Sequence, residues 1–157
     1  MIASLPAPMS ESSTKDALSV ALFSEIFMAG QLSRNTLSKA LPKGMELSHF
    51  SVLNHLAHSS DPRSPAQLAK AFHLTRGAMT NTLAKLEWAG YVHIHPDWDD
   101  ARRKIVTISP AGRAARDAAL QAISPILSDV VAKIGADQVR TVLPVLRKLR
   151  ENLGDDG

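Results

Sequence analysis

The chain has 157 residues, which suffices for one compact domain or for a small binding unit with helical extensions. Its 18 Lys and Arg residues against 15 Asp and Glu leave a net charge of only +3, so the totals alone do not indicate a polyanionic partner. The absence of cysteine excludes disulfides, thiolate-zinc sites and thiol-based sensing of oxidants.

The N-terminal residues 1–13 are rich in serine and proline and are predicted to form a disordered tail. Pro6 and Pro8 interrupt the continuous apolar core that a signal peptide needs. No apolar run in the chain reaches the ~18 residues of a membrane-spanning helix. We therefore expect a soluble, cytoplasmic protein that does not associate with a membrane.

Three helices are predicted between this tail and residue 60. Apolar residues repeat at helical spacing from 16 to 29, and a second helix is predicted from 31 to 41. A third helix runs from 47 to 57 and ends in the Ser-Ser-Asp-Pro turn at 59–62. This third helix is expected to pack behind the two helices that follow it.

The next segment carries the signals of two helices joined by a short turn. Ser64 can cap the first helix, Pro65 suits its first position, and the Gln67 side chain can bond back to the cap residue. Thr75 can cap the second helix, which runs to about residue 88 and ends at Gly90. Two helices with so short a connection form a helix-turn-helix.

The second of these helices has two distinct faces. At 100° per residue, Met79, Leu83 and Leu86 share one side and belong to the core. The opposite side is centred on Gly77 and Asn81, and its small residues allow another surface to come close. The polar side chains on that side and in the first turn are of types that read base edges or bind phosphate: Arg76, Thr80, Asn81 and Lys85. This face suits a recognition helix in a DNA major groove, and the alternative is an ordinary solvated helix face.

Alternating apolar residues predict a pair of strands at 91–95 and 104–108, with Val92 and Val106 facing inward. The loop between them, 96–103, is too polar for a core and too long for a tight turn. A hairpin with a charged loop directly after a recognition helix is a wing. Wings commonly place an arginine in the neighbouring minor groove, where the negative potential is strongest.

After the wing the pattern is helical again. One long helix is predicted from 110 to about 134, bent or broken at Pro125 and closed by Gly135. Asp137 can cap a last helix, in which Pro144 predicts a kink or a break. The helices at both ends of the chain carry more apolar surface than the segment between them can cover, so we expect them to bury it against a partner.

Three blocks occur in this order: Leu86-Glu87 with Ala89-Gly90-Tyr91-Val92, then Asp100-Ala101-Arg102, then Ile108-Ser109-Pro110-Ala111-Gly112. Together they resemble the MarR family of bacterial transcription regulators, whose pattern is approximately L-E-x-x-G-[LYW]-[VI], a wing D-x-R, and L-T-x-x-G. Ser109 replaces the usual threonine, and Asn81 stands where many members carry arginine. The resemblance extends from about Lys15 to Leu153.

The resemblance implies a mostly α fold with a small two-stranded β wing: a winged helix-turn-helix with helical dimerisation extensions at both termini. The expected division is 1–13 tail, 14–46 N-terminal helices contributing to dimerisation, 47–110 DNA-binding domain, and 111–157 C-terminal dimerisation helices. It further implies a homodimer that binds double-stranded DNA at a palindromic operator, as a ligand-responsive repressor. The expected DNA-contacting residues are Thr75, Arg76, Gly77, Thr80, Asn81, Lys85, Arg102 and Arg103, with Asp100 supporting Arg102 in the wing.

A small-molecule crevice between the dimerisation helices and the winged helix is also implied by the resemblance, and it often accepts aromatic acids or phenolic compounds. The expected lining is Phe23, Phe27, Met28, His49, Phe50 and Leu53, with Arg113 or Arg116 able to pair a carboxylate. The alternative for each apolar member is a place in the core.

Two other classes of function remain as alternatives. His55 and His58 are three apart on one helix, with His49 earlier on it, which raises a zinc-responsive regulator of the same fold. No cysteine or glutamate completes a ligand set, so we expect no metal and no cofactor. An adaptor that binds other proteins is disfavoured by the small, basic face around Asn81. The sequence holds no recognisable catalytic constellation, so an enzyme is not expected.

Overall fold

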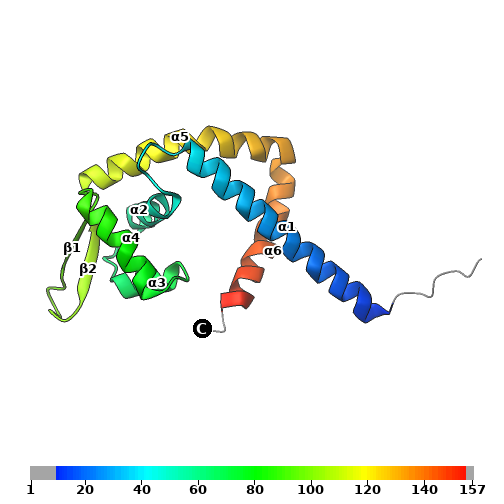
Figure 1. Cartoon of the computed structure of the whole chain (residues 1–157), viewed down its shortest axis with the longest axis horizontal. Coiled ribbons are helices and arrows are strands. Elements are labelled where there is room, and N and C mark those ends of the chain that lie inside the picture. The colour runs from blue at the N-terminus through cyan, green and yellow to red at the C-terminus, as the bar shows by residue number, and fades with distance from the viewer. Residues whose placement is uncertain (1–9, 155–157) are drawn as a thin grey trace, which may run out of the picture. The chain divides into compact units, whose positions relative to one another are not determined.

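The computed structural model describes residues 10–154, and these are mostly helical with one two-stranded antiparallel sheet (Figure 1). The elements are α1 (Glu11–Ala40), α2 (Leu47–His58), α3 (Pro65–Ala71), α4 (Arg76–Trp88), β1 (Val92–Pro96), β2 (Lys104–Ile108), α5 (Pro110–Ile134) and α6 (Ala136–Gly154). The chain divides into two compact units between Lys39 and Ala40. The predicted fold class, helices with a small β wing, is confirmed.

The first unit is one continuous helix, α1, where the sequence predicted two helices. The expected break near Gly30 is absent, because a glycine inside a helix costs only ~1 kcal/mol relative to alanine and keeps its backbone N–H. Since α1 begins at Glu11, residues 11–13 are helical and the prediction of disorder was wrong for them. The remainder of the predicted tail, residues 1–9, lies outside the described residues.

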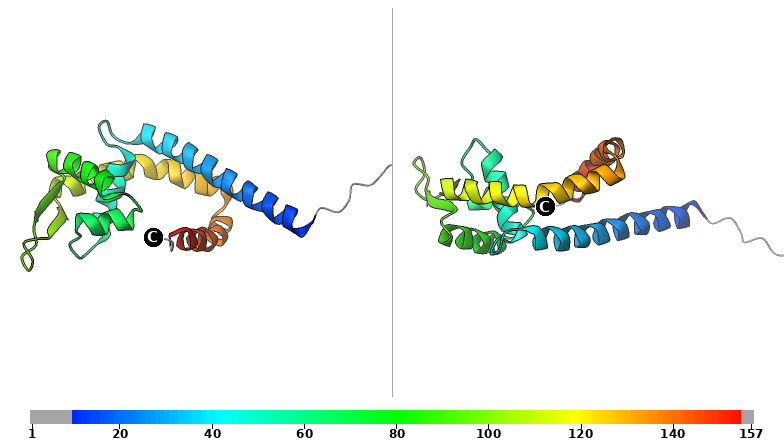
Figure 2. Two further views of the ribbon diagram at one scale, coloured as in Figure 1. Left: turned by 60° about the horizontal axis from the view of Figure 1, so that its bottom comes forward. Right: turned by 90° about the horizontal axis from the view of Figure 1, so that it is seen from above.

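A single cluster of buried side chains forms the core of the second unit. It joins α2, α3, α4 and both strands, and the two views of Figure 2 show these elements gathered together. Its members are Val52, Leu53, Leu56, Leu68, Ala69, Met79, Leu83, Leu86, Val92 and Val106. The three residues assigned to the inner face of α4 are therefore buried as predicted.

The helix-turn-helix begins and turns where the capping residues indicate. The Ser64 hydroxyl accepts the backbone N–H of Gln67 at 3.1 Å, while the Gln67 side chain accepts the Ser64 N–H at 2.9 Å. The Thr75 hydroxyl accepts the N–H of Ala78 at 3.1 Å and starts α4. Between the helices His73 adopts a φ of 51°, which reverses the chain in the turn.

The wing strands pair in the expected register, with Val92 opposite Ile108 and Ile94 opposite Val106. Val92 and Val106 are each 1% exposed, so the inward face of the hairpin seals the core. The structure also shows a backbone contact of the hairpin that the sequence did not reveal. The N–H of Val106 in β2 donates to the carbonyl of Arg63 at 2.7 Å. This bond ties the wing to the segment just before α3.

The junction from the wing into α5 explains why this segment needs serine and glycine. The Ser109 hydroxyl accepts the N–H of Gly112 at 2.9 Å and donates to the carbonyl of Gly90 at 2.6 Å. A Cβ on Gly112 would overlap the carbonyl oxygen of Tyr91 and lie 2.9 Å from Ile108. The first turn of α5 therefore packs directly on the chain that leaves α4, which leaves no room for a side chain.

The two long C-terminal helices continue through their prolines. α5 runs unbroken past Pro125 and α6 past Pro144, so the predicted breaks are absent. A proline removes only one backbone donor, and the turns on either side of it keep their own bonds. The helices meet at Gly135, where φ is 100° and the axis turns by 102°. Among the described residues no single helix meets the length and hydropathy of a membrane span, although α5 and α6 together do.

Candidate nucleic-acid interface

The outer face of α4 is a shallow, open surface made of small and polar side chains. Gly77, Thr80, Asn81 and Lys85 are all exposed, on the side opposite the buried Met79. A Cβ placed on Gly77 would meet no atom within 4 Å. Within the described residues, the missing side chain at Gly77 therefore serves no packing purpose, and it leaves the helix backbone accessible to a large partner.

Two aspartates of the wing loop accept hydrogen bonds from other residues of the same loop. The Asp100 side chain accepts both the backbone N–H and the Nε–H of Arg102, at 3.1 and 3.2 Å. Asp97 accepts the N–H of Asp99 at 3.0 Å. Arg102 itself is 92% exposed, so Asp100 orients the guanidinium without covering it. The Asp100–Arg102 contact that the D-x-R resemblance implies is thus present.

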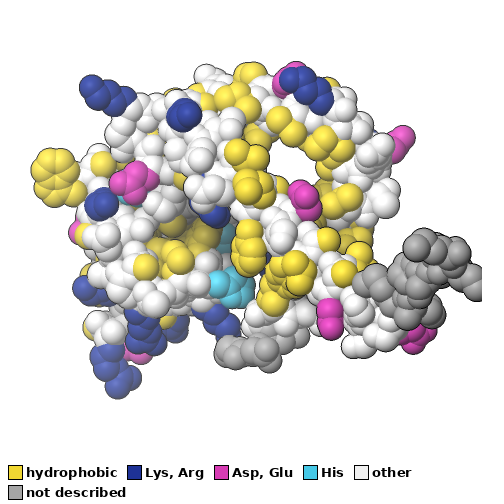
Figure 3. Space-filling view, turned by 45° about the vertical axis from the view of Figure 1, so that its right-hand side comes forward, with side chains coloured by type: hydrophobic (Ala, Val, Ile, Leu, Met, Phe, Trp, Pro, Cys, Tyr) yellow, Lys and Arg dark blue, Asp and Glu magenta, His cyan; other side chains and the backbone are white. Residues whose placement is uncertain are grey.

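A groove of about 550 Å³ lies between the start of α3, the first turns of α4 and the base of the wing. Four cations line it, Arg76, Arg102, Arg103 and Lys104, and no acidic residue of the described chain does. Lys and Arg side chains gather at the lower left of Figure 3, on the side where Figure 1 places the wing. This placement gives a chain of nearly balanced charge a local polycationic surface, which attracts a polyanion.

Two lining residues of this groove were not among the predicted contacts. Lys104 was assigned only to a strand, and Gln67 only to a cap. Both become part of the site because the hairpin folds back beside the start of α3. A neighbouring groove of about 450 Å³, also lined by Lys104, continues between α4 and β1 past Ala84 to Glu87. Nothing in the local sequence pattern indicates this long-range juxtaposition.

Lys85, at the edge of the outer face of α4, forms an ion pair with Glu46, the residue before α2. Its amine lies 3.7 Å from the Glu46 carboxylate, which also lies 3.9 Å from Nε2 of His49. The backbone N–H of Glu46 donates to Nδ1 of His49 at 3.3 Å, so the proton of the neutral ring is on Nε2. That nitrogen has no hydrogen-bond partner among the described residues. Burial lowers the pKa of His49, the Glu46 carboxylate partly opposes this shift, and Lys85 adds to it.

The predicted effector residues fall on both units. On α1, the rings of Phe23 and Phe27 lie 6.2 Å apart, and Phe27 is 70% exposed. On α2, His49 and Phe50 are both buried, as the core alternative requires. Their assembly into one crevice stays a prediction.

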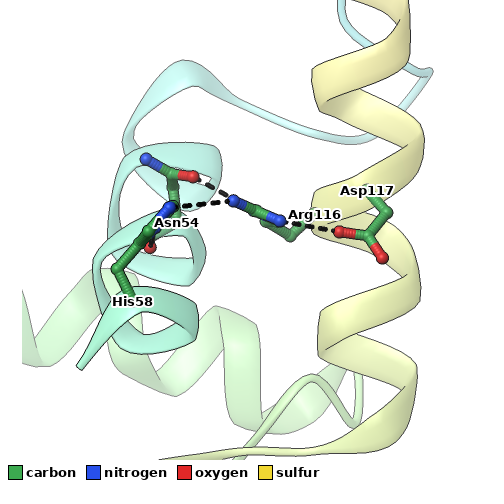
Figure 4. Close-up of polar contacts among 4 residues, drawn as sticks. All are labelled: Asn54, His58, Arg116 and Asp117. Atoms are coloured by element: carbon green, nitrogen blue, oxygen red, sulfur yellow. Dashed lines mark hydrogen bonds and ion pairs between the residues drawn. The ribbon is translucent and has the colours of Figure 1, made fainter. Parts of the chain in front are cut away.

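Arg116 joins α5 to α2 through a polar network (Figure 4). Its Nε donates to Asn54 at 3.0 Å, one terminal nitrogen donates to Asp117 at 2.9 Å, and the other lies 3.4 Å from Nε2 of His58. These partners occupy the guanidinium of Arg116. Arg113 is exposed and lines a small groove with Ser59 and Pro62 at the C-terminal end of α2, away from His49 and Phe50 at its start.

The histidines of α2 are engaged in packing. Nδ1 of His58 lies 2.8 Å from the carbonyl of Asn54, which makes it the donor, and His55 meets the ring of Phe72 edge-on at 5.4 Å. Within residues 10–154 no three metal-ligating side chains come together. The histidine pair thus has local partners that account for it.

Comparisons with known proteins agree with this geometry. A MarR-family model matches residues 43–103. An HTH-type transcriptional repressor of Mycobacterium tuberculosis is 31% identical over 132 residues, covering 83% of this chain and 91% of its own. The transcriptional activatory protein BadR of Rhodopseudomonas palustris is 25% identical over 142 residues, covering 87% and 81% of the two chains.

Solved structures show the same fold. The regulator BldR of Sulfolobus solfataricus superimposes with a TM-score of 0.78 at 26% identity, over 92% of this chain and 99% of that one. A mutant MarR of E. coli complexed with operator DNA gives 0.75 at 26% identity, over 83% and 94%. The chain therefore belongs to the MarR family of transcriptional regulators.

Proposed function

We propose that the protein is a repressor that binds a palindromic DNA operator as a homodimer and releases it when a small aromatic acid or phenolic compound binds. The observation that carries the DNA-binding part is the open face of α4 beside a groove with four cations and no acidic lining residue. A related MarR structure holds operator DNA. The repressor of M. tuberculosis is the more similar of the two relatives described, which favours repression over activation.

Each recognition element has a distinct role in this proposal. Asn81, with Arg76 and Thr80, contacts base edges in the major groove, where asparagine suits adenine and arginine suits guanine. Thr75 and Lys85 position the helix on phosphates. In the wing, Arg102, which Asp100 orients, enters the minor groove, and Arg103 meets the phosphates at the border of that groove.

The homodimer is supported by apolar surface that the single chain leaves open. No residue of α1 or α6 is buried, although both helices carry apolar stripes. Leu18 and Phe27 on α1 are 72% and 70% exposed, and Val145 and Leu153 on α6 are 60% and 62% exposed. Figure 3 shows hydrophobic side chains, in yellow, that lie uncovered on the surface. A two-fold axis would cover them and present two α4 helices to successive major grooves, ~34–36 Å apart.

The effector would act through the spacing of those two helices. A ligand lowers DNA affinity only if it binds the DNA-incompetent arrangement more tightly, and a tenfold effect needs ~1.4 kcal/mol of such preference. The residues proposed to bind the effector are Phe23 and Phe27 of α1 and His49 and Phe50 of α2, with Arg113 or Arg116 pairing its carboxylate. Arg116 would have to leave its network before it could serve.

The test combines sedimentation with DNA selection. Analytical ultracentrifugation of the full chain at micromolar concentration is expected to give a dimer. Repeated binding to a random duplex library, followed by mobility shift, is expected to enrich a palindrome. A monomer that retains no duplex would overturn the proposal. Aromatic carboxylates that raise the melting temperature are then added to the complex, and the absence of any release would refute the effector part alone.

A further inference from the structure

The two tryptophans of the chain are almost completely exposed. Trp88 ends α4 with 93% of its surface open, and Trp98 lies in the wing loop with 94% open. An indole is large and apolar and is on average strongly buried, so keeping one in water is unfavourable. The described chain offers Trp88 no covering partner.

Trp88 lies on the outer face of α4, on the same side as Asn81. It follows Asn81 by seven residues, which at 100° per residue brings it within about 20° of the Asn81 direction and ~10 Å farther along the helix. Its neighbours one turn back are Ala84 and Lys85, both exposed, while Leu86 points into the core. The short side chain of Ala84 leaves one flank of the indole open.

The charges beside this face indicate what would cover the indole. The cationic groove lies beside the first turns of this helix, and a neighbouring groove that shares Lys104 with it extends past Ala84 to Glu87, the residue before Trp88. On the outer face of α4, the exposed Lys85 adds a cation about one turn before the indole. A polyanion seated on Arg76, Arg103 and Lys104 would therefore pass along α4 toward its last turn. A duplex has this charge, and its deoxyriboses also offer apolar surface between the phosphates.

We propose that Trp88 packs against the sugar–phosphate backbone at the edge of the major groove that α4 enters. The ring face lies on a deoxyribose, and the indole N–H, a donor only, bonds a phosphate oxygen. The groove is ~12 Å wide, so a side chain ~10 Å beyond the base-reading Asn81 reaches its wall. Because every nucleotide carries the same sugar and phosphate, Trp88 adds affinity without selecting a sequence. This inference rests on the proposed DNA binding.

Trp98 is the matched comparison. It is equally exposed, but it lies directly between Asp97 and Asp99 in the wing loop, and these carboxylates disfavour a phosphate at the indole itself. The proposed DNA contacts of the wing belong to Arg102 and Arg103. Removing Trp98 should therefore weaken binding to the duplex much less than removing Trp88.

The experiment uses the duplex enriched by the selection described above and single-tryptophan variants of the full chain. In Trp98→Phe, the remaining Trp88 is expected to lose acrylamide accessibility about twofold or more when the duplex is added. Trp88→Ala is expected to weaken binding about tenfold, equivalent to ~1.4 kcal/mol, on every duplex alike, whereas Trp98→Ala changes it little. Trp88→Phe should recover most of the loss, because it keeps the ring face.

Three outcomes would overturn the inference while leaving DNA binding intact. Trp88 could stay fully accessible in the retarded complex, or Trp88→Ala could bind as tightly as the parent chain. Trp88→Ala could also change the sedimentation coefficient without changing DNA affinity, which would assign the indole to a protein contact. If the parent chain retains no duplex at all, the proposed function fails first and this inference fails with it.

Discussion

The winged helix-turn-helix and the terminal helices use their apolar residues in opposite ways. The winged helix-turn-helix buries most of its leucines, together with Val52, Val92, Val106 and Met79, among α2, α3, α4 and the wing, with several side chains at 0–2% exposure. The latter, α1 and α6, contain no buried residue. Both regions thus contain apolar residues, but only the winged helix-turn-helix buries them in a core within one chain. In the proposed homodimer, a second chain would cover the apolar surface of the second region.

The largest expected effect tests the first region at its tightest point. Gly112→Ala forces a Cβ onto the Tyr91 carbonyl, and backbone cannot move aside cheaply, so we expect a loss of about 4 kcal/mol in the free energy of unfolding. Chemical denaturation of both proteins measures it.

Gly77→Ala is the matched control, because its Cβ meets nothing. It should stabilise the chain by ~0.5–1 kcal/mol. Equal stability of the two variants would show that the junction with Tyr91 tolerates a side chain.

The second prediction breaks the terminal region. Leu146→Glu places a charge in the apolar stripe of α6, and burying it unpaired at a dimer contact costs several kcal/mol, so we expect the dimer dissociation constant to rise about a hundredfold or more. Sedimentation velocity reports the change, and circular dichroism should show that the winged helix stays folded.

Lys148→Gln makes the same change in charge on the opposite side of α6, two residues later. It should leave the dimer intact. If both variants weaken association equally, the stripe is not the interface.

A third prediction concerns the base-sequence specificity of the outer face of α4. Asn81→Ala should lose ~1–3 kcal/mol of discrimination between the selected duplex and one altered at the contacted base pair. Competition binding with a panel of single-base variants measures the ranking. An unchanged ranking would move specificity to DNA shape.

Arg102→Ala provides the complementary case in the wing. Minor-groove contact predicts the greatest loss on A·T-rich flanks, whereas a phosphate contact predicts a uniform loss with a salt slope reduced by ~1. Affinity unchanged on every duplex would exclude both kinds of contact for Arg102.

The smallest expected effect is the pH dependence of stability at His49. Burial lowers the folded-state pKa of this histidine below its unfolded value of 6.5, so the unfolded chain binds the proton more readily. Its contribution is therefore fully present above pH 6.5 and falls as the pH decreases from there toward the folded pKa. Melting temperatures between pH 7.5 and 5 should fall less steeply for His49→Gln than for the parent chain. Identical slopes would show that His49 does not titrate differently on folding.

Much of the winged helix-turn-helix follows from signals that lie close together along the chain. The caps at Ser64 and Thr75, the inner face of α4 and the pairing of the wing strands were all predicted, because each depends on residues a few positions apart. The same holds for the residues of the exposed face around Asn81. The contact between Asp100 and Arg102 also spans only two residues, and the resemblance to the MarR family implied it.

Two kinds of feature could not be predicted from the sequence: contacts between distant segments, and whether a helix continues through a glycine or a proline. The Arg116–Asn54 bond links residues 62 positions apart, and Lys104 and Gln67 share a groove only because the hairpin folds back beside α3. The prohibition of a side chain at Gly112 depends on the place of the Tyr91 carbonyl, not on backbone φ. A break was predicted near Gly30, and a bend or a break at Pro125 and at Pro144. The helices are continuous through all three, because one weak position costs less than ending the hydrogen-bond ladder on both sides.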